Sequence, residues 1–376
     1  MKEIVLVGGG HAHVLVLRAF ADRPEPGVRL TLVTRDLRTP YSGMLPGHVA
    51  GLYRRDEIHI DLVRLAGSCG ARLVHAEAIG FDRRAKQVRL RNGAPVPYNI
   101  LSIDIGITPD LGGLAGAAEH ALIVKPIGGF LDRWDRLLAA AMETEGPRRI
   151  VVVGGGVAGI CLVFAVAAAL RRSATARGFD PSAFIFTLVS AEAPTELNPR
   201  ARGRVRRALQ RRRIEIVAGE TASAVERGDV RLASGRRIAC DAALVSTQAA
   251  PPSALENADF ARDADGFVAV RPTLQTLDDD DVFAVGDCAA MVAHPRPKAG
   301  VFAVRQGPAL AGNLRRYARG DALVAHVPQK DWLILISTGD ERAIGARGRW
   351  LAVEGRWVWR LKDWIDRRFM RRFETP

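Results

Sequence analysis

The sequence has little cysteine and few aromatic residues. Four of its 376 residues are Cys, and Phe, Trp and Tyr together make up 6%. The cysteines are Cys69, Cys161, Cys240 and Cys288. None lies near another in sequence, which excludes a CxxC motif, a disulfide scaffold and a zinc knuckle, and no metal site is expected. This usage favours a reduced, cytoplasmic setting, and the first ten residues lack the pattern of a signal peptide.

The composition otherwise describes a folded globular protein. Apolar residues make up 48% and charged residues 25%, which excludes disordered and collagen-like chains. The length predicts two or three domains of about 150 residues each. The formal net charge of +13 comes mostly from Arg. This charge either attracts anionic partners or is spread over a solvated surface. We favour the second for most of the chain, and expect no nucleic-acid partner.

One uncharged run has the length of a transmembrane helix. Residues 151–170 carry no charged side chain, and about 20 apolar residues can span a bilayer. The letters GGGVAG interrupt the run near its start. Such glycine punctuation favours a strand, a tight turn and a helix instead of a membrane span.

Two segments show the order strand, glycine turn, helix, strand. In the first, an apolar run over residues 2–7 ends in GGG, a helical stretch follows, and residues 28–34 alternate apolar side chains. In the second, residues 149–153 run into GGGVAG, a helix and the strand-like segment 184–190. This is the order of a Rossmann-type βαβ unit. The sequence therefore predicts an α/β fold with two dinucleotide-binding units.

The glycine turns indicate what these units bind. A glycine turn lets backbone N–H groups approach a pyrophosphate, and the helix N-terminus adds partial positive charge. The second turn has the complete set, Gly154, Gly156 and Gly159. In the first turn Gly8 and Gly10 fit, but His13 stands where a small residue normally allows close helix–strand packing. Two such turns in one chain suggest a flavin and a nicotinamide cofactor.

A later strand-like segment, residues 282–285, runs into Gly286-Asp287. An Asp in this position accepts a hydrogen bond from a ribityl hydroxyl of a flavin, or caps a following helix. Both roles remain open from the sequence.

Several motifs together resemble the FAD-dependent pyridine nucleotide-disulfide oxidoreductase superfamily. They are VGGGHAHV at 7–14, LSIDIGITPD at 101–110, VVVGGGVAG at 151–159 and VFAVGDCA at 282–289. The chain is also similar to the NADH-dehydrogenase-like flavoproteins related to the domain fused in front of selenophosphate synthetase. That narrower resemblance rests on RTPYSGMLPG at 38–47, VKPIGGFLDRW at 124–134, PKAGVFAVRQGPALAGNLR at 297–315, LISTGD at 335–340 and GRWVWRLKDWIDRRFMRRF at 355–373. No selenophosphate synthetase domain is expected within these residues.

The resemblance implies a domain plan and a set of site residues. Residues 1–112 and 243–322 would form a discontinuous FAD domain, 113–242 an inserted NAD(P)-binding-like domain, and 323–376 a C-terminal α/β element. The implied FAD site comprises Gly8, Gly9, Gly10, His11, Thr34, Arg35, Ser42, Gly43, Leu45, Pro46, Ala78, Asp104, Gly106, Gly286, Asp287, Lys298, Gly300, Val301 and Phe302. The implied NAD(P) site comprises Gly154, Gly156, Gly159, Ser190 and Gln248.

The chain departs from the superfamily pattern at several places. Residues 41–50 contain no Cys, so a redox disulfide is not expected. Thr34 and Ser190 stand where many relatives have an acidic residue that holds an adenosine ribose. Gln248 replaces the glycine of an ATG-like turn. Its side chain either occupies the space meant for nicotinamide or rotates into solvent.

Cys161 and Lys298 are the candidate catalytic residues. Cys161 stands where relatives have a Glu near the flavin–nicotinamide contact. It is either a thiol activated by a helix N-terminus or, as we favour, a buried structural residue. Lys298 is either a cation that stabilises reduced flavin or a surface residue. His11 and His13 are expected to be packing or pyrophosphate-adjacent groups, because hydride transfer to a flavin needs no side-chain base.

The C-terminal segment, residues 355–373, has the pattern of a basic amphipathic helix. Val358, Leu361, Ile365 and Phe369 fall on one helical face, with Arg and Trp residues around them. Such a helix suits an anionic membrane surface, and similar flavoproteins dock on membranes in this way to reach quinone. The alternative is a helix packed on its own flavin domain or in a homodimer interface.

These observations predict an FAD-dependent oxidoreductase that passes hydride from NAD(P)H to flavin and on to a quinone or another small electron acceptor. One alternative is a flavoprotein with a degenerate nicotinamide site that acts directly on a small organic substrate. Another is a non-catalytic redox or partner-binding flavoprotein linked to selenium metabolism. The expected location is cytoplasmic or peripheral on the inner face of the membrane.

Overall fold

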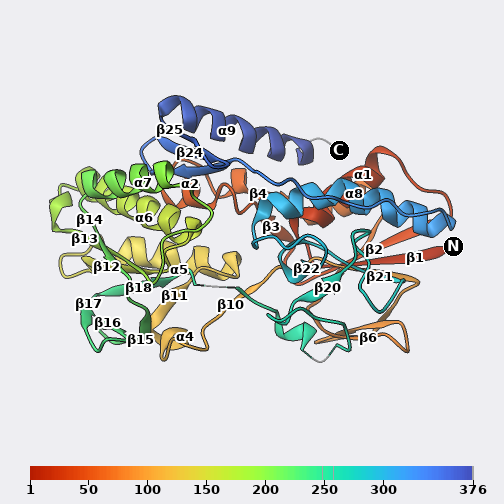
Figure 1. Cartoon of the computed structure of the whole chain (residues 1–376). Helices are drawn as coiled ribbons and strands as arrows, with labels where there is room; N and C mark the ends of the chain where they lie inside the picture. The colour runs from red at the N-terminus through yellow and green to blue at the C-terminus, as the bar shows by residue number, and fades with distance from the viewer. Residues whose placement is uncertain (248, 257, 375–376) are drawn as a thin grey trace.

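The computed structural model describes residues 1–247, 249–256 and 258–374. Two five-stranded parallel sheets lie at the two ends of an elongated molecule, and the C-terminal helix α9 (Arg356–Met370) runs along one side across the junction between them (Figure 1). The predicted α/β fold with two Rossmann-type units and an additional C-terminal element is confirmed.

The first sheet has the strand order β21-β9-β1-β2-β5. The strands are β1 (Lys2–Val7), β2 (Val28–Thr34), β5 (Arg72–His75), β9 (Ile100–Ile103) and β21 (Val282–Ala284). Residues 4–7 of β1 are at most 1% exposed, as expected of a central parallel strand covered on both faces. Its helices are α1 (His11–Asp22), α3 (Leu62–Ser68) and α8 (Gly300–Arg319), of which α1 packs on both others.

The second sheet has the order β11-β18-β12-β13-β14. The strands are β11 (Ala121–Ile123), β12 (Arg149–Val153), β13 (Ile185–Ser190), β14 (Ile214–Ala218) and β18 (Ala242–Val245). The longer helices are α5 (Ile127–Ala140), α6 (Val157–Ala176) and α7 (Pro199–Arg211). Because β18 pairs with both β11 and β12, it belongs to this sheet. The boundary expected after residue 242 therefore cuts this strand, and the second unit extends at least to residue 245.

The long apolar helix of the second unit is α6. It is long and apolar enough to cross a membrane, but 67% of its most apolar window is buried inside the protein. It follows β12 through the glycine turn, as the interrupted run predicted. A core helix of a parallel α/β sheet is apolar for this reason, because it is covered on most sides.

The remaining elements are short and connect or cover the two sheets. Strands of the antiparallel ladders are β3 (Arg38–Pro40), β4 (His59–Asp61), β6 (Ala78–Asp82), β7 (Gln87–Leu90), β8 (Val96–Pro97), β10 (Thr108–Pro109), β15 (Ala222–Glu226), β16 (Asp229–Leu232), β17 (Arg237–Ala239) and β19 (Ala249–Ala250), and β20 (Val268–Val270) pairs in parallel with β22 (Ala289–Met291). Short helices are α2 (Leu45–Val49), α4 (Ala117–His120), η1 (Asp56–Ile58), η2 (Pro181–Ala183), η3 (Ser253–Leu255), η4 (Gly286–Cys288) and η5 (Arg371–Phe373). The pair β10–β19 links the two units.

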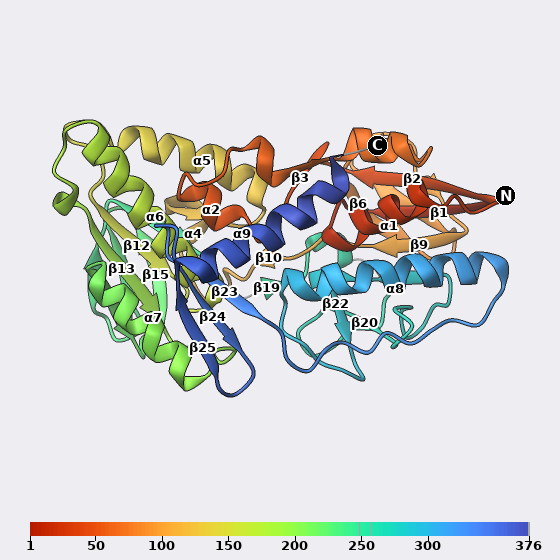
Figure 2. The ribbon, with the colours of Figure 1, turned by 90° about the horizontal axis from the view of Figure 1, so that it is seen from above.

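The C-terminal element is a three-stranded antiparallel sheet followed by α9. Its strands are β23 (Ile334–Ser337), β24 (Ala343–Arg347) and β25 (Leu351–Gly355). Seen from above, α9 crosses from this sheet towards the first unit (Figure 2). The residues of the predicted apolar face of α9 differ in exposure. Val358 and Phe369 are buried, but Leu361 is 37% exposed, and the charged pair Lys362 and Asp366 is buried instead.

Candidate cofactor sites

The first glycine turn joins β1 to α1. Gly8 has a φ of +96°, and a Cβ there would overlap the backbone carbonyl of Asp104. A Cβ at Gly10 would overlap the Asp104 carboxyl group. The backbone N–H groups of Gly9, Gly10 and His11 have no hydrogen-bond partner within the described part of the chain. Free amides at a helix N-terminus form a ready anion-binding site.

The bulky third position of this turn, His13, is accommodated by two hydrogen bonds. Its Nδ1 lies 2.7 Å from the carbonyl oxygen of Gly8, and its Nε2 lies 2.8 Å from the hydroxyl of Ser102. Because a carbonyl oxygen only accepts, Nδ1 carries the proton and Nε2 accepts from Ser102. Burial lowers the pKa of His13 to about 4, so the ring is neutral. His13 therefore does not disrupt the turn, and Ser102 supplies the partner that a small residue would not need.

The turn after β21 meets the first glycine turn. Gly286 has a φ of +67°, and a Cβ there would overlap the Asp104 side chain. Its N–H donates to Oε1 of Gln306 at 2.7 Å. The next residue, Asp287, pairs through Oδ2 with Nζ of Lys125 at 3.2 Å. Lys125 lies between β11 and α5, so this pair joins the second unit to the first.

The segments expected to border the flavin ring also come together. A Cβ at Gly300 would lie 3.1 Å from the hydroxyl oxygen of Ser42. The N–H of Ser42 donates to Nε2 of His11 at 3.4 Å. The pKa of His11 is lowered to about 4, chiefly by burial, while Asp287 raises it and Lys125 lowers it. These side chains therefore lie close to one another beside the first glycine turn.

The other residues predicted for this region lie on the same segments. Gly43 precedes α2, Leu45 and Pro46 open it, Lys298 precedes α8, and Val301 and Phe302 lie in the first turn of α8. The ring of Phe302 lies 5.1 Å from that of Trp332, edge to face. This contact ties the first turn of α8 to the C-terminal element, which the sequence analysis did not anticipate.

The ammonium group of Lys298 already has partners within the protein. Its Nζ donates to the carbonyl oxygen of Ala289 at 2.7 Å and lies 3.7 Å from the centre of the Phe267 ring. Burial lowers its pKa. Lys125 is instead the cation that reaches Asp287. The sequence reasoning missed Lys125, although the motif VKPIGGFLDRW contains it.

A hollow of about 240 Å³ lies at the carboxyl ends of β2 and β5. It is lined by Arg35, His75, Ala76, Glu77, Arg91 and Asn92. Thr34 closes the preceding turn, because its hydroxyl donates to the carbonyl oxygen of Asp36 at 2.9 Å. Of the remaining predicted residues, Ala78 opens β6 next to this hollow, and Gly106, with a φ of +70°, lies in the turn between β9 and β10.

These features fit FAD. The free amides of the first glycine turn suit a diphosphate, and the hollow beside Arg35 suits an adenosine. The segments that carry Ser42, Gly300 and Asp287 come together at the other end of this turn, where the flavin end would lie. The cradle is shaped by glycines whose Cβ atoms would fill it or collide with its walls.

The second glycine turn has the close packing that its spacing predicts. Gly154 has a φ of +124°, and a Cβ there would overlap the carbonyl oxygen of Ser246. A Cβ at Gly159 would overlap the carbonyl oxygen of Gly154, whereas a Cβ at Gly156 would meet nothing within 4 Å. Gly156 therefore leaves open space at the start of α6, where a dinucleotide pyrophosphate can approach.

Two hydroxyl groups at the expected ribose and nicotinamide ends of this second site already donate hydrogen bonds within the protein. The hydroxyl of Ser190 donates to the carbonyl oxygen of Glu192 at 2.5 Å, so it closes the turn after β13. The hydroxyl of Thr247 donates to the carbonyl oxygen of Asp110 at 2.9 Å. Gln248 lies outside the described residues, and the two alternatives for its side chain stay open.

Cys161 has the surroundings of a structural residue. It is 6% exposed, and burial raises the pKa of its thiol to about 11. A nearby Lys362 and a hydrogen bond with the backbone of Ser337 lower that pKa only in part. The burial of this side chain and the raised pKa of its thiol favour the buried structural residue over a thiol activated by the helix N-terminus. Within the described ranges, no group of three or more His, Cys, Asp or Glu side chains could hold a metal ion.

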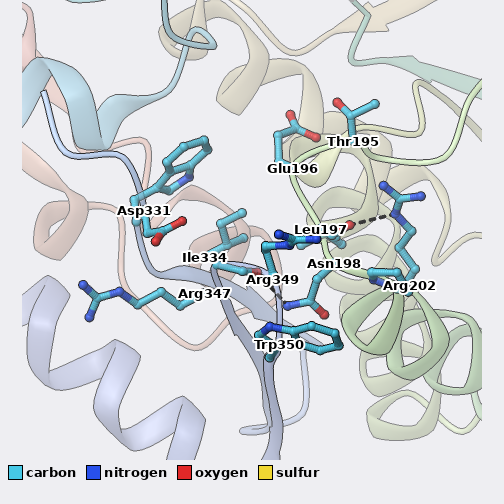
Figure 3. Close-up of a pocket in the computed structure, with 13 residues that line it drawn as sticks. Thr195, Glu196, Leu197, Asn198, Arg202, Asp331, Ile334, Arg347, Arg349 and Trp350 are labelled. Carbon is cyan, nitrogen blue, oxygen red and sulfur yellow. Dashed lines mark hydrogen bonds between the residues drawn. The ribbon is translucent and has the colours of Figure 1, made fainter.

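A larger cavity, of about 470 Å³, lies between the start of α7 and the C-terminal sheet (Figure 3). Asn198 bridges its two sides, since Nδ2 donates to the carbonyl oxygens of Gly348 and Leu351 at 3.0 and 2.9 Å. Arg202 and Trp350 line it as well. None of the described residues predicted for FAD or NAD(P) lines this cavity, which lies where the C-terminal element attaches to the second unit.

Comparison with known proteins identifies the family of the chain. The family model described as pyridine nucleotide-disulphide oxidoreductase matches residues 2–307. The chain belongs to this family. It is therefore a flavoprotein oxidoreductase with FAD as its cofactor and NAD(P)H as its substrate, as the motifs predicted.

The oxidoreductase is similar to proteins with several named activities. It is 23% identical over 337 residues to the NADH dehydrogenase-like protein YutJ of Bacillus subtilis, which covers 88% of the chain and 87% of that protein. The sulfide:quinone oxidoreductase of Aquifex aeolicus has the same fold, with a TM-score of 0.83 and 18% identity over 99% of the chain and 91% of that structure. NDH2 of Plasmodium falciparum, solved in a complex with NADH, aligns with a TM-score of 0.81 and 11% identity over 100% of the chain and 99% of that structure.

Proposed function

We propose that the oxidoreductase takes hydride from NAD(P)H onto FAD and reduces a quinone. The observation that carries the proposal is the Lys125–Asp287 pair, which joins the unit with the second glycine turn to the turn that faces the flavin end of the first site. This contact brings the second unit to the turn of Asp287, and hydride transfer between two bound dinucleotides requires the two units to meet in this way. A quinone acceptor is supported by the named activity of the Aquifex aeolicus protein of the same fold.

The residues of the chain bind, orient and shield the reactants. FAD supplies the chemistry, since it accepts hydride and gives up electrons in pairs or singly. The amides of Gly9, Gly10 and His11 would hold its diphosphate, and Asp287 would hold the ribityl chain. The neutral ring of His11 places no charge beside the flavin end, and Lys125 offsets the charge of Asp287. Positioning of this kind can account for a large part of a rate enhancement.

Anaerobic mixing with NADH or NADPH tests the proposed donor reaction. The purified yellow protein should lose its flavin absorbance rapidly with at least one of the two nucleotides, and added quinone should restore it. Absence of bleaching with both nucleotides would contradict the proposal. A small organic substrate that reduces the flavin directly would then become the better explanation.

We also propose that α9 contacts an anionic membrane surface, where a quinone is available. Its outer face carries Trp357, Leu361 and Trp364, which are 57%, 37% and 53% exposed. They recur at helical spacing, and the guanidinium of Arg368 lies 5.1 Å from the centre of the Trp364 ring. Exposed Trp next to Arg is typical of interfacial helices. The opposite face of α9 packs on the protein itself, so both expected roles of the helix are compatible.

Cosedimentation with lipid vesicles tests this surface. The wild-type protein should pellet with vesicles that contain anionic lipid, and less so with neutral vesicles or at high salt. The variant Trp357→Ser/Leu361→Ser/Trp364→Ser should lose most of this binding. The matched control is Val327→Ser, which removes an apolar side chain that is 69% exposed but lies outside α9. Equal pelleting of all three proteins would exclude membrane contact through α9.

A further inference from the structure

Asp104 is a buried carboxyl group at the centre of the FAD site. It follows β9 and is 2% exposed. Its Oδ2 accepts hydrogen bonds from the backbone N–H groups of Ala12 at 2.9 Å and His13 at 3.1 Å. No Lys or Arg in the described part of the protein forms an ion pair with it. A carboxyl group of the protein therefore already accepts hydrogen bonds from two amides of the first turn of α1.

The same carboxyl group lies between the two turns that form the diphosphate cradle. A Cβ at Gly10 would overlap both of its oxygens, and a Cβ at Gly286 would overlap Oδ1. The glycines at these positions are thus required by Asp104 itself. A diphosphate bound to the free amides of Gly9, Gly10 and His11 would lie beside the same side chain.

The charges around Asp104 favour its protonated form. Burial is the main factor and raises the pKa of Asp104 to about 7, the hydrogen bonds from α1 lower it in part, and Asp287 from η4 raises it further. The other titratable neighbours carry no compensating charge. Nδ1 of His13 donates to Gly8 and its low pKa keeps the ring neutral, and burial raises the pKa of the Cys288 thiol to about 12. Lys125 is paired with Asp287.

We propose that the protein takes up one proton on Asp104 when FAD binds, so that the carboxyl group is neutral beside the diphosphate. The proton comes from solvent, and no electrons move. An ionised Asp104 and a diphosphate would repel each other in a site with little solvent, whereas a protonated carboxyl removes that repulsion. Oδ2 continues to accept from Ala12 and His13, and the proton on Oδ1 becomes a hydrogen-bond donor within the cradle. The inference rests on the FAD site alone and does not depend on the acceptor.

The expected consequence is an FAD affinity that falls with rising pH. Below the pKa that Asp104 has in the protein without FAD, the proton is already present and the affinity for FAD is constant. Above it the proton must be taken up with the cofactor, so the dissociation constant should rise about tenfold per pH unit. Between pH 7.5 and 9 this effect should dominate the pH dependence of binding.

The test measures the dissociation constant of FAD from the deflavinated 376-residue protein between pH 6 and 9. Flavin fluorescence monitors the binding. Calorimetric titration at pH 8.5 in two buffers of different ionisation enthalpy counts the protons, and about one per FAD is expected. Asp104→Asn cannot ionise, keeps an oxygen acceptor for α1, and should bind FAD with little pH dependence, about tenfold more tightly than wild type at pH 8.5. Asp287→Asn is the control. It should bind FAD more weakly but keep most of the slope.

Three outcomes would overturn the proposal. They are a wild-type affinity that is constant over this pH range, a proton count near zero at pH 8.5, and an Asp104→Asn variant with the wild-type slope. The proton count on the wild-type protein decides the question even where the variant fails to fold. Failure of wild-type protein to bind FAD at any pH would instead contradict the FAD site itself, and a lack of bleaching by NAD(P)H would leave the proton count unaffected.

Discussion

Replacing Gly159 by Ala should reduce the rate of flavin bleaching by NAD(P)H by about 100-fold and leave FAD bound. The new Cβ would overlap the carbonyl oxygen of Gly154, so α6 must move away from the end of β12. That movement displaces the turn on which the pyrophosphate of NAD(P)H would lie. A misplacement of about 1 Å can cost about 100-fold in rate. The FAD site is built on a different sheet and should keep its yellow colour and its FAD affinity.

Stopped-flow bleaching under anaerobic conditions measures this effect. The matched control is Gly203→Ala in α7 of the same unit, where a Cβ would come only within 3.7 Å of the flexible end of Arg207. This control should bleach at the wild-type rate and be slightly more stable, because Ala favours a helix over Gly. A Gly159→Ala protein that bleaches like the control would show that NAD(P)H does not bind at the second glycine turn.

The second large effect concerns a buried ion pair between two residues of α9 itself, Lys362 and Asp366. Nζ of Lys362 lies 2.5 Å from Oδ2 of Asp366, and their side chains are 8% and 6% exposed. Nζ also donates to the carbonyl oxygen of Gly43 at 2.7 Å, in the segment that borders the flavin end. Burial raises the pKa of Tyr41 above its usual value, and Asp366, whose carboxylate accepts a hydrogen bond from the Tyr41 hydroxyl, raises it further.

Replacing Lys362 by Met should destabilise the protein by about 3–5 kcal/mol, because it leaves Asp366 buried without a partner. The double variant Lys362→Met/Asp366→Leu should regain most of that stability, since no buried charge remains. Denaturant unfolding followed by Trp fluorescence measures both changes. The control is Asp363→Asn, which breaks the half-exposed pair of Asp363 with Arg367 and should cost no more than about 1 kcal/mol. Equal effects of Lys362→Met and Asp363→Asn would contradict the description of the buried pair.

The contribution of the Lys362–Asp366 pair to the free energy of unfolding depends on pH, and the burial of Asp366 sets the sign of this dependence. The pKa of Asp366 is raised, chiefly by desolvation, even though Lys362 lowers it. A raised pKa in the folded state means that ionised Asp366 opposes folding, so its net contribution becomes less favourable as the pH rises through the unfolded and then the folded pKa. The pair therefore fixes the position of α9 over residues 41–43 more than it adds to stability.

The glycine turns and the order strand, glycine turn, helix, strand of both units could be predicted from the sequence. They depend on local chemistry, because a strand followed by glycines and a helix has few alternative folds. The return of the chain to the first unit was implied by the family resemblance alone. The identity of the buried face of α9 could not be predicted. Apolar periodicity grouped Leu361 with Val358 and Phe369 on one face and gave no sign that Lys362 is buried. The Lys362–Asp366 pair is buried there because each partner neutralises the other.

The site residues also fall into two groups, those that a local motif locates and those whose partners are distant in the sequence. The residues of the first glycine turn, Ser42, Gly300 and Asp287 were placed near one another by motif alone, and the structure brings their segments together. Lys298 was assigned to the flavin because it lies in a motif, yet its ammonium group is held by Ala289 and Phe267. Lys125 was missed, because its partner Asp287 lies 162 residues away in the other unit.

The sequence by itself determined that this protein has two dinucleotide-binding units, because the glycine spacing and the hydrophobic strands involve residues that are close together in the sequence. Only the tertiary structure decided which partners the charged groups meet, since Asp104, Lys125 and Lys362 each contact residues from distant segments. Burial raises the pKa of Asp104, and both this burial and those contacts depend on how the two units and the C-terminal helix pack together.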